Sequence, residues 1–451
     1  MTFSPVERLT LLLSLACHTP EERAELDAIA ADPALDWAAV DRLASHNAIR
    51  PLAHRHLRDT GHWPRVPAAI AEPWQAFAER IAETNRLRLE TAQPIFAAAA
   101  ARGVRIAVLK GIYFAPTYYG DPAYKKMNDI DFLIRPADLE PLLALYREHH
   151  YFCLAKLFDD EKQLDFSHHT PPYVHRSLRC VLGTHWGLVS PQTRFKPDYE
   201  ALWSRVVPFE FLGNRHWALH PVDNLHHLCL HLPYYKAGLR EIADLYNLLR
   251  AEPDFDWALF LREVEKAHSE PLAYHALSLV NALVPMPGVQ AAIDHLAPRV
   301  KGFYAADTRR RVAEPRRILH GRSTLMSEID KAFGEFTMTD RFPEKWRAFL
   351  GMWGRGLVAP REEVARFHYR DAGAWYLPLL YPSMASRVIR YVAKDLGPKN
   401  FALLVLYMNY SLAKSAYRTA TGRNKPDDWA VLAETHGLGR EDLLTLKAML
   451  E

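Results

Sequence analysis

Two short segments decide the fold of this chain: V-R-I-A-V-L-K-G (residues 104–111) and, after a short interval, K-K-M-N-D-I-D-F-L-I (residues 125–134). Each segment predicts a short buried strand, and a glycine turn ends the first strand. Successive side chains of a strand point to opposite faces. The apolar residues of the second strand therefore share one face, and Asp129 and Asp131 share the other.

The two aspartates indicate a metal site. Neighbouring carboxylates repel each other, and each raises the free energy of ionising the other. A cation between them removes that cost, and hard divalent ions prefer oxygen ligands. We therefore predict that Asp129 and Asp131 bind Mg²⁺ or Mn²⁺. The alternative is a solvated strand edge with no ligand.

Lys110 and Gly111 follow the first strand directly. Glycine has no Cβ, so backbone amides beside it can approach a phosphate closely. Lys110 would add a positive charge to a triphosphate. The alternative is that Gly111 is only a turn residue and Lys110 only a solvated strand end.

Helical patterns flank this core, which predicts an α+β fold. Apolar residues such as Trp37 and Val40 recur at helical spacing before the core. Short apolar segments separated by proline and glycine turns predict further strands after it. We expect an N-terminal helical segment over 1–93, a small mixed-sheet core over 94–220 and a larger helical region over 221–451.

The composition is that of a globular protein. The chain has 451 residues, of which 49% are hydrophobic and 24% charged, with a net charge of +3. This charge is too small to indicate nucleic-acid binding. Four cysteines far apart predict reduced thiols and a cytoplasmic location. The apolar runs at 9–17 and 401–408 are shorter than the roughly 20 residues that span a bilayer, so we expect buried helices and no membrane partner.

Several motifs together resemble the uncharacterised nucleotidyltransferase family of the polymerase-β-like superfamily. V-L-K-G, Y-Y-G-D-P and M-N-D-I-D-F-L-I follow one another in the core. D-W-A-A-V-D-R-L-A-S-H-N-A-I-R-P-L precedes them, and H-H-T-P-P-Y, T-H-W-G-L, L-C-L-H-L and L-R-E-I-A-D-L follow in the family's order. The resemblance covers roughly residues 30–270.

The resemblance implies a reaction. In the superfamily, two carboxylates hold divalent metals that bridge a nucleoside triphosphate, and an acceptor hydroxyl displaces pyrophosphate from the α-phosphorus. Asp129 and Asp131 would hold the metal, and Lys110 and Gly111 would lie against the phosphates. Lys125 stands with a second lysine where relatives have Arg-Pro, and it would keep positive charge near the triphosphate. The acceptor would be a hydroxyl of a small molecule, peptide or protein.

One departure from the family pattern concerns a third carboxylate. We expect it two residues before the His-Trp pair, but Gly183 occupies that position in L-G-T-H-W. His185 shares a strand face with Gly183, and its near-neutral pKa would suit a substitute base or ligand. The alternative is a structural histidine packed beside Trp186.

Gly183 also supports a rival interpretation, in which the chain keeps the fold but has lost catalysis and acts as a binding or scaffold protein in a biosynthetic pathway. A third acid beside Asp129 and Asp131, from residues 151–220, would favour the enzyme. Apolar or basic surroundings would favour the scaffold.

A third interpretation uses the histidines. A zinc site, or a metal hydrolase, would need three of them within coordination distance. The default is that they are core and surface residues. The candidates are His168, His169, His175, His226, His227 and His231.

Overall fold

The computed structural model describes part of the chain. The described residues are 3–154, 167–191, 193–232, 238–301, 303–320 and shorter stretches between 342 and 450. The chain divides into two compact units. The first comprises Met1–Ser190, Pro197–Arg322 and Leu444–Glu451, and the second comprises Pro191–Lys196 and Ser323–Leu443. The division of the chain at residues 93 and 220 stays a prediction.

The centre of the first unit is one mixed sheet of seven strands, in the order β3-β4-β5-β2-β1-β7-β6. The strands are β1 Ala107–Val108, β2 Ile130–Leu133, β3 Tyr151–Cys153, β4 Tyr173–His175, β5 Val181–His185, β6 Val207–Phe211 and β7 Asn214–Ala218. Strand β2 pairs antiparallel with β1 and parallel with β5. Because β2 lies between two strands, both of its edges are hydrogen-bonded and all four of its residues are buried.

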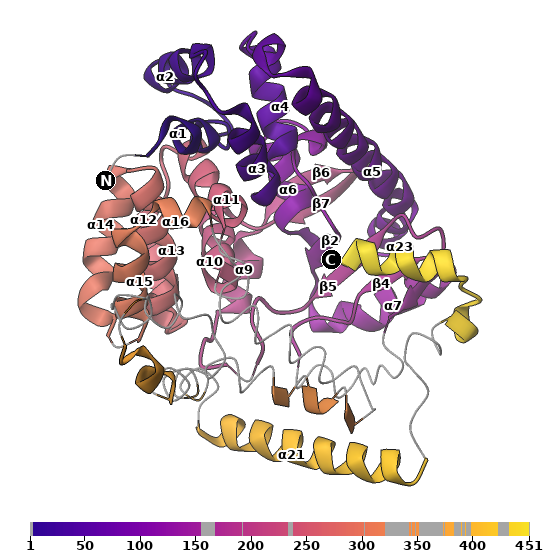
Figure 1. Cartoon of the computed structure of the whole chain (residues 1–451). Helices are drawn as coiled ribbons and strands as arrows, with labels where there is room; N and C mark the ends of the chain where they lie inside the picture. Colours follow the sequence, from indigo (N-terminus) through magenta and orange to yellow (C-terminus); the bar gives the residue numbers. More distant parts are fainter. Residues whose placement is uncertain are drawn as a thin grey trace. The chain divides into compact units, whose positions relative to one another are not determined.

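Helices precede, cover and follow the sheet, so the α+β prediction is confirmed (Figure 1). The helices are α1 Pro5–Leu12, α2 Pro20–Ala31, α3 Trp37–His46, α4 Arg50–Asp59, α5 Ala68–Ala101, α6 Lys110–Tyr118, α7 Leu139–Glu148, α9 Tyr199–Arg205, α10 Pro221–His231, α11 Leu239–Ala251, α12 Trp257–Lys266, α13 Glu270–Leu283, α14 Pro287–Leu296, α15 Phe303–Ala313 and α16 Arg316–Leu319. A further helix, α23 Arg440–Leu450, belongs to the first unit from Leu444 onward. None of the described helices is both long and apolar enough to cross a bilayer.

Local sequence explains how the first helices begin. Ser4 and Thr19 cap α1 and α2, and a glutamate three residues later completes a capping box in each case. The apolar run that starts at Leu9 is buried in and just after α1. The prediction of a buried first helix is therefore confirmed for Leu9–Leu12, whereas residues 13–16 are buried after the helix has ended and Cys17 is exposed.

Helix α6 replaces the glycine turn and loop predicted after the first strand. The turn is made one residue earlier, by Lys110, whose φ of 49° lies in the left-handed region. Residues 112–115 of α6 are all buried. Burying apolar side chains contributes about 1.5–3 kcal/mol each, which outweighs a cost of about 3 kcal/mol for a proline such as Pro116 inside a helix. The turn prediction was wrong because it weighed local signals alone.

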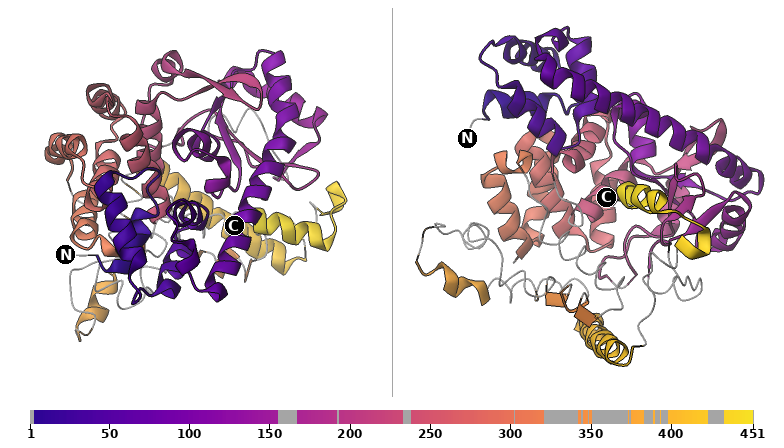
Figure 2. Two further views of the ribbon diagram at one scale, coloured as in Figure 1. Left: turned by 90° about the horizontal axis from the view of Figure 1, so that it is seen from above. Right: turned by 45° about the vertical axis from the view of Figure 1, so that its right-hand side comes forward.

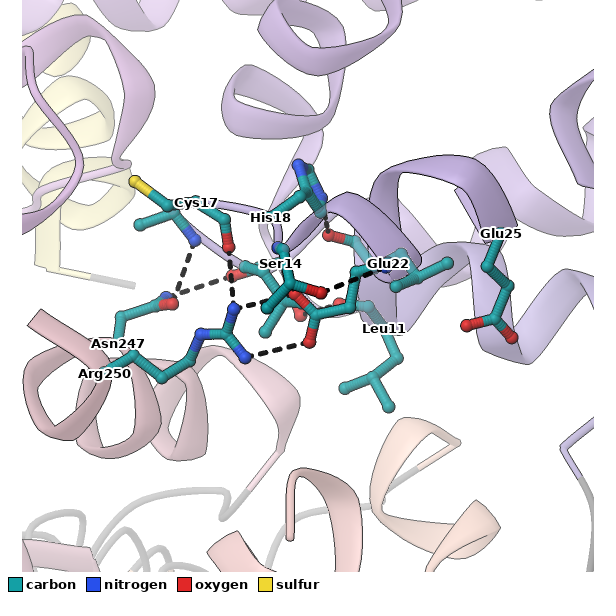
Figure 3. A network of polar contacts seen from close by, with 12 residues as sticks. Leu11, Ser14, Cys17, His18, Glu22, Glu25, Asn247 and Arg250 are labelled. Carbon is teal, nitrogen blue, oxygen red and sulfur yellow. Dashed lines mark hydrogen bonds and ion pairs between the residues drawn. The ribbon is translucent and has the colours of Figure 1, made fainter. Parts of the chain in front are cut away.

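Polar contacts attach the N-terminal helices to α11 (Figure 3). The amide of Asn247 accepts a hydrogen bond from the backbone of Ala16 at 2.9 Å and donates one to the carbonyl of Ser14 at 3.0 Å. Arg250 forms an ion pair with Glu22 at 2.7 Å. In both views of Figure 2 the indigo N-terminal helices accordingly lie beside helices of the later part of the unit. These contacts fix α11, which carries Asp244, the partner of Lys125 in the segment before β2.

The second unit contains helix α21, Pro398–Ala420. The predicted helix at 401–408 is present, but its side chains are not all in a core. Leu403, Leu406 and Tyr407 are exposed, whereas Met408 is buried. The prediction of a core helix therefore holds for only one face.

Candidate functional site

Lys110 lies where β1 passes into α6. The backbone N–H of Leu109, just before it, donates to the carbonyl of Asp131 at 2.9 Å, so the two strand ends are in register. The left-handed conformation of Lys110 is uncommon for a residue with a Cβ, and such strained residues occur often at functional sites. Its Nζ donates to Oδ2 of Asp131 at 2.6 Å.

Asp131 is buried in the central strand β2, and cationic or proton-donating groups hold both of its oxygens. Besides Lys110 on Oδ2, Nε2 of His185 donates to Oδ1 at 3.0 Å. Burial by itself would raise the pKa of this carboxyl. The Lys110 charge and the His185 hydrogen bond outweigh that effect, so the pKa lies well below its usual range. Asp131 is therefore ionised at neutral pH.

Asp129 differs from Asp131 in its surroundings. It precedes β2 and is exposed. Within the described residues its carboxylate has no hydrogen-bond or ion-pair partner. The protein nevertheless crowds the group, and the loss of hydration, followed by the Asp131 charge, raises the pKa of Asp129 to about 6. The positive charges of Lys110, Arg88 and Arg240 act in the opposite direction. The structure thus combines a paired buried carboxylate with an unpaired accessible one.

Gly183 faces Asp131 across the β2–β5 pairing. A Cβ at Gly183 would lie 2.0 Å from Oδ1 of Asp131 and 3.6 Å from Nε2 of His185. The carboxylate of Asp131 therefore occupies the space into which a side chain at position 183 would extend. No third carboxylate joins Asp129 and Asp131 in a metal-binding group in the part of the chain that the structure describes. Residues 155–166, which include several acids, lie outside that part.

His185 acts in the structure as the partner of Asp131, at the end of β5. Burial lowers its pKa to about 4, although the hydrogen bond to Asp131 works in the other direction. The ring is therefore neutral at neutral pH. Because an ionised carboxylate only accepts hydrogen bonds, Nε2 carries the proton and Nδ1 carries a lone pair. Whether this nitrogen serves as a base stays a prediction.

Lys125 and Gly111 have other neighbours in the structure. Nζ of Lys125 donates to both oxygens of Asp244, at 2.7 and 2.9 Å. A Cβ at Gly111 would lie 2.9 Å from Cγ of Met127, so the glycine allows α6 to pack closely on the segment before β2. The roles of Lys125 and Gly111 at phosphates stay predictions.

Five histidines gather beside Lys110, and we call them the histidine cluster: His168, His169, His185, His227 and His231. Ring centroids lie 4.4 Å apart for His168 and His169, 5.2 Å for His169 and His185, 5.8 Å for His168 and His185, 6.2 Å for His168 and His231 and 4.5 Å for His227 and His231. No three metal-binding side chains of the described residues are arranged to hold a metal ion.

The remaining candidate histidines lie elsewhere. His175 packs against Tyr151, and His226 hydrogen-bonds to the hydroxyl of Ser269 at 2.8 Å. Sequence reasoning missed that these histidines gather close enough to Lys110 for its charge to lower the pKa of four of them. The one available signal was the i, i+4 spacing of His227 and His231 on a helix, and that spacing does not reveal what the helix packs against.

Comparison with known proteins identifies the family of this chain. A family model described as an uncharacterised nucleotidyltransferase matches residues 33–285. The chain belongs to this family. The matched span contains all the strands of the described sheet as well as Lys110, Asp129, Asp131 and His185. No curated protein and no solved structure matches the chain. Membership confirms the resemblance seen in the motifs and supports nucleotidyl transfer as a general role.

Proposed function

We propose that this protein transfers a nucleoside monophosphate from a triphosphate to an acceptor hydroxyl of a small molecule, peptide or protein, and that pyrophosphate is released. Asp129 and Asp131 would hold Mg²⁺ or Mn²⁺. The observation that supports this most is that the accessible, unpartnered carboxylate of Asp129 and the ionised carboxylate of Asp131 lie together at the start of β2. Lys110 lies beside them at the end of the neighbouring strand.

The carboxylates present fit one ion better than two. Mg²⁺ is commonly bound by one or two carboxylates together with substrate phosphates, and Asp129 has oxygens available for that purpose. A second ion would call for a further carboxylate, but the space at Gly183 is filled by Asp131. When bound, the ion supplies charge neutralisation and orientation of the triphosphate.

The chain's own residues would divide the remaining tasks. As the triphosphate binds, the ammonium group of Lys110 would move from Asp131 to the phosphates. Its charge lowers the pKa of His185 in the structure, so this movement raises that pKa and makes Nδ1 a better base. His185 then accepts the proton of the acceptor hydroxyl, while Nε2 stays hydrogen-bonded to Asp131.

The test incubates the protein with each labelled triphosphate, Mg²⁺ or Mn²⁺ and cell lysate, and measures transferred label. We expect Asp129→Asn and Asp131→Asn each to reduce transfer by about 10²–10³-fold, which is the scale of losing one transition-state contact. Asp254→Asn is the matched control, because Asp254 is an exposed aspartate far along the chain. Transfer that survives both site substitutions at the wild-type rate contradicts the proposal.

A second candidate function is ligand binding without transfer, as a scaffold protein. Two observations support it. Lys110 and His185 are hydrogen-bonded to the two carboxylate oxygens of Asp131, and Gly183 provides no further carboxylate. If the protein is a scaffold, we expect a triphosphate to bind with the same affinity in the presence of Mg²⁺ and in the presence of a metal chelator. The nucleotidyltransferase proposal expects chelation to weaken binding, and calorimetric titration separates the two.

A further inference from the structure

The histidine cluster points to the kind of acceptor that the site takes. His169 and His185 are bridge partners, because the segment before β4 runs antiparallel to the end of β5. Residues paired across neighbouring strands project their side chains from the same face. Their ring centroids are 5.2 Å apart. This face also carries Asp131 and the position of Gly183.

Hydrogen bonds determine which nitrogens of these two rings hold protons. Nδ1 of His169 bonds to the carbonyl of Thr170 at 2.7 Å, and Nε2 of His185 bonds to Asp131 at 3.0 Å. A carbonyl and an ionised carboxylate only accept, so each ring donates through the named nitrogen. In a neutral imidazole the second nitrogen is then an acceptor. The pair therefore presents two lone pairs, Nε2 of His169 and Nδ1 of His185.

The surroundings of the other histidines in the cluster do not change these protonation states. His168 and His227 form no ion pair with a carboxylate within the described residues. Burial comes first among the effects that lower the pKa of His168 to about 2 and hold that of His227 well below its usual range. Lys110 adds to both effects. These rings are therefore neutral, and the two lone pairs of His169 and His185 fit hydrogen-bond donors and disfavour an anionic acceptor.

We propose that the acceptor substrate is a polyhydroxylated small molecule, such as a sugar or cyclic polyol, and that two of its neighbouring hydroxyls donate to Nε2 of His169 and Nδ1 of His185. The inference rests on the proposed function. Of the three acceptor classes named there, which are small molecules, peptides and proteins, it selects the small molecules. The hydroxyl on His185 is the one that receives the nucleotide, and its proton passes to Nδ1. His169 holds the neighbouring hydroxyl and acts as a specificity residue.

Binding is tested first, without triphosphate or metal, by ligand-observed NMR with myo-inositol as the probe. Cyclohexanol, which has the same ring and one hydroxyl, is the matched probe. We expect a signal for inositol and about tenfold weaker binding of cyclohexanol. A tenfold difference corresponds to about 1.4 kcal/mol, which is within the range for a neutral hydrogen bond. The same binding to both probes, or to neither, overturns the proposal.

Two variants connect the binding to His169. His169→Phe keeps a ring but loses the lone pair, so inositol affinity should fall about tenfold. His169→Gln supplies an amide oxygen as a replacement acceptor and should recover part of that affinity. His175→Phe, on β4 and away from the cluster, is the matched control and should bind as the wild type does. Thermal unfolding of all three shows that each is folded.

Transfer assays then separate this proposal from the proposed function. With labelled triphosphate and Mg²⁺, a cyclic polyol or sugar should accept label, and His169→Phe should raise the KM for the acceptor about tenfold while the KM for triphosphate stays within twofold. Label on a serine peptide with none on polyols overturns the acceptor class and leaves nucleotidyl transfer intact. No transfer at all, together with normal inositol binding, contradicts the proposed function alone.

Discussion

Two buried lysine–aspartate pairs lie in the first unit, and they differ in what surrounds the carboxylate. Lys125 and Asp244 are 2.7 Å apart, and their side chains are 10% and 12% exposed. Lys110 and Asp131 are 2.6 Å apart, with 21% and 7% exposed. The distances are nearly equal, so distance alone does not distinguish a structural pair from a functional one.

The neighbours make the distinction. Asp244 also accepts a hydrogen bond from the hydroxyl of Tyr119 at 2.7 Å, and Lys125 lies over the Tyr119 ring. The pair joins the segment after η2, Pro122–Tyr124, to α11 and is satisfied internally. Asp131 lies instead beside the accessible carboxylate of Asp129 and the histidine cluster. A buried charge next to an unpaired acid is the arrangement expected of a ligand site.

The largest expected effect is on stability, at the structural pair. Lys125→Met leaves Asp244 buried without its counter-ion and should reduce the free energy of unfolding by about 3–5 kcal/mol. Lys110→Met should cost less, because His185 still donates to Asp131 and Lys110 is the more exposed lysine. Urea unfolding of the two variants side by side measures the difference. Equal losses would mean that both pairs are structural.

The next effect concerns Gly183. Gly183→Ala places a Cβ 2.0 Å from Oδ1 of Asp131, so the carboxylate must move from His185. We expect a loss of about 1–3 kcal/mol in unfolding free energy, as for other overpacked sites. In an Asp131→Ala background the same substitution should cost much less, because the colliding atoms are absent. An unchanged cost in that background would show that the strain lies elsewhere.

A smaller effect is expected at Gly111. A Cβ there would lie 2.9 Å from Cγ of Met127. Because the methionine side chain is flexible, Gly111→Ala should lower the unfolding free energy by about 1 kcal/mol, toward the low end for overpacking. Thermal unfolding tests this, and triphosphate titration of the same variant tests the phosphate role. Lost affinity with unchanged stability would mean that Gly111 serves the ligand rather than the packing.

The smallest effect is on pH dependence, and it separates the two carboxylates. The pKa of Asp129 is raised to about 6, above about 3.9 for an unfolded chain. The folded state then binds more protons between these values, so the contribution of Asp129 to stability is present below pH 4 and is lost as the pH rises through 6. Asp131 has the opposite sign, because its pKa is lowered: its contribution is present above pH 4 and is lost on acidification.

Carboxyl NMR measures this directly. The Asp129 resonance should titrate with a midpoint near pH 6, and Asp131→Asn should move the midpoint downward by removing one of the two causes. The amount by which the Asp129 pKa of that variant still exceeds the value of an unfolded chain measures the effect of lost hydration. A wild-type midpoint near pH 4 would mean that neither the loss of hydration nor the charge of Asp131 raises the pKa of Asp129.

The sequence by itself determined the elements and the family. The 3.6-residue and two-residue periods predict helices and strands because they reflect which face is buried. The capping boxes at Ser4 and Thr19 mark helix starts through contacts only three residues long. The spacing of Asp129 and Asp131, with Lys110 before them, carried the family resemblance, and all of these signals are local.

Only the tertiary structure decided which partner each charged group takes. Lys125 contacts Asp244, 119 positions away, and His185 contacts Asp131, 54 positions away. The order of strands in the sheet brings β1, β2 and β5 together and so places Lys110 and His185 on one carboxylate. No periodic pattern encodes that order, because it results from packing across the whole unit. For the same reason, five histidines scattered through 64 positions, 168 to 231, became one cluster near the end of β5.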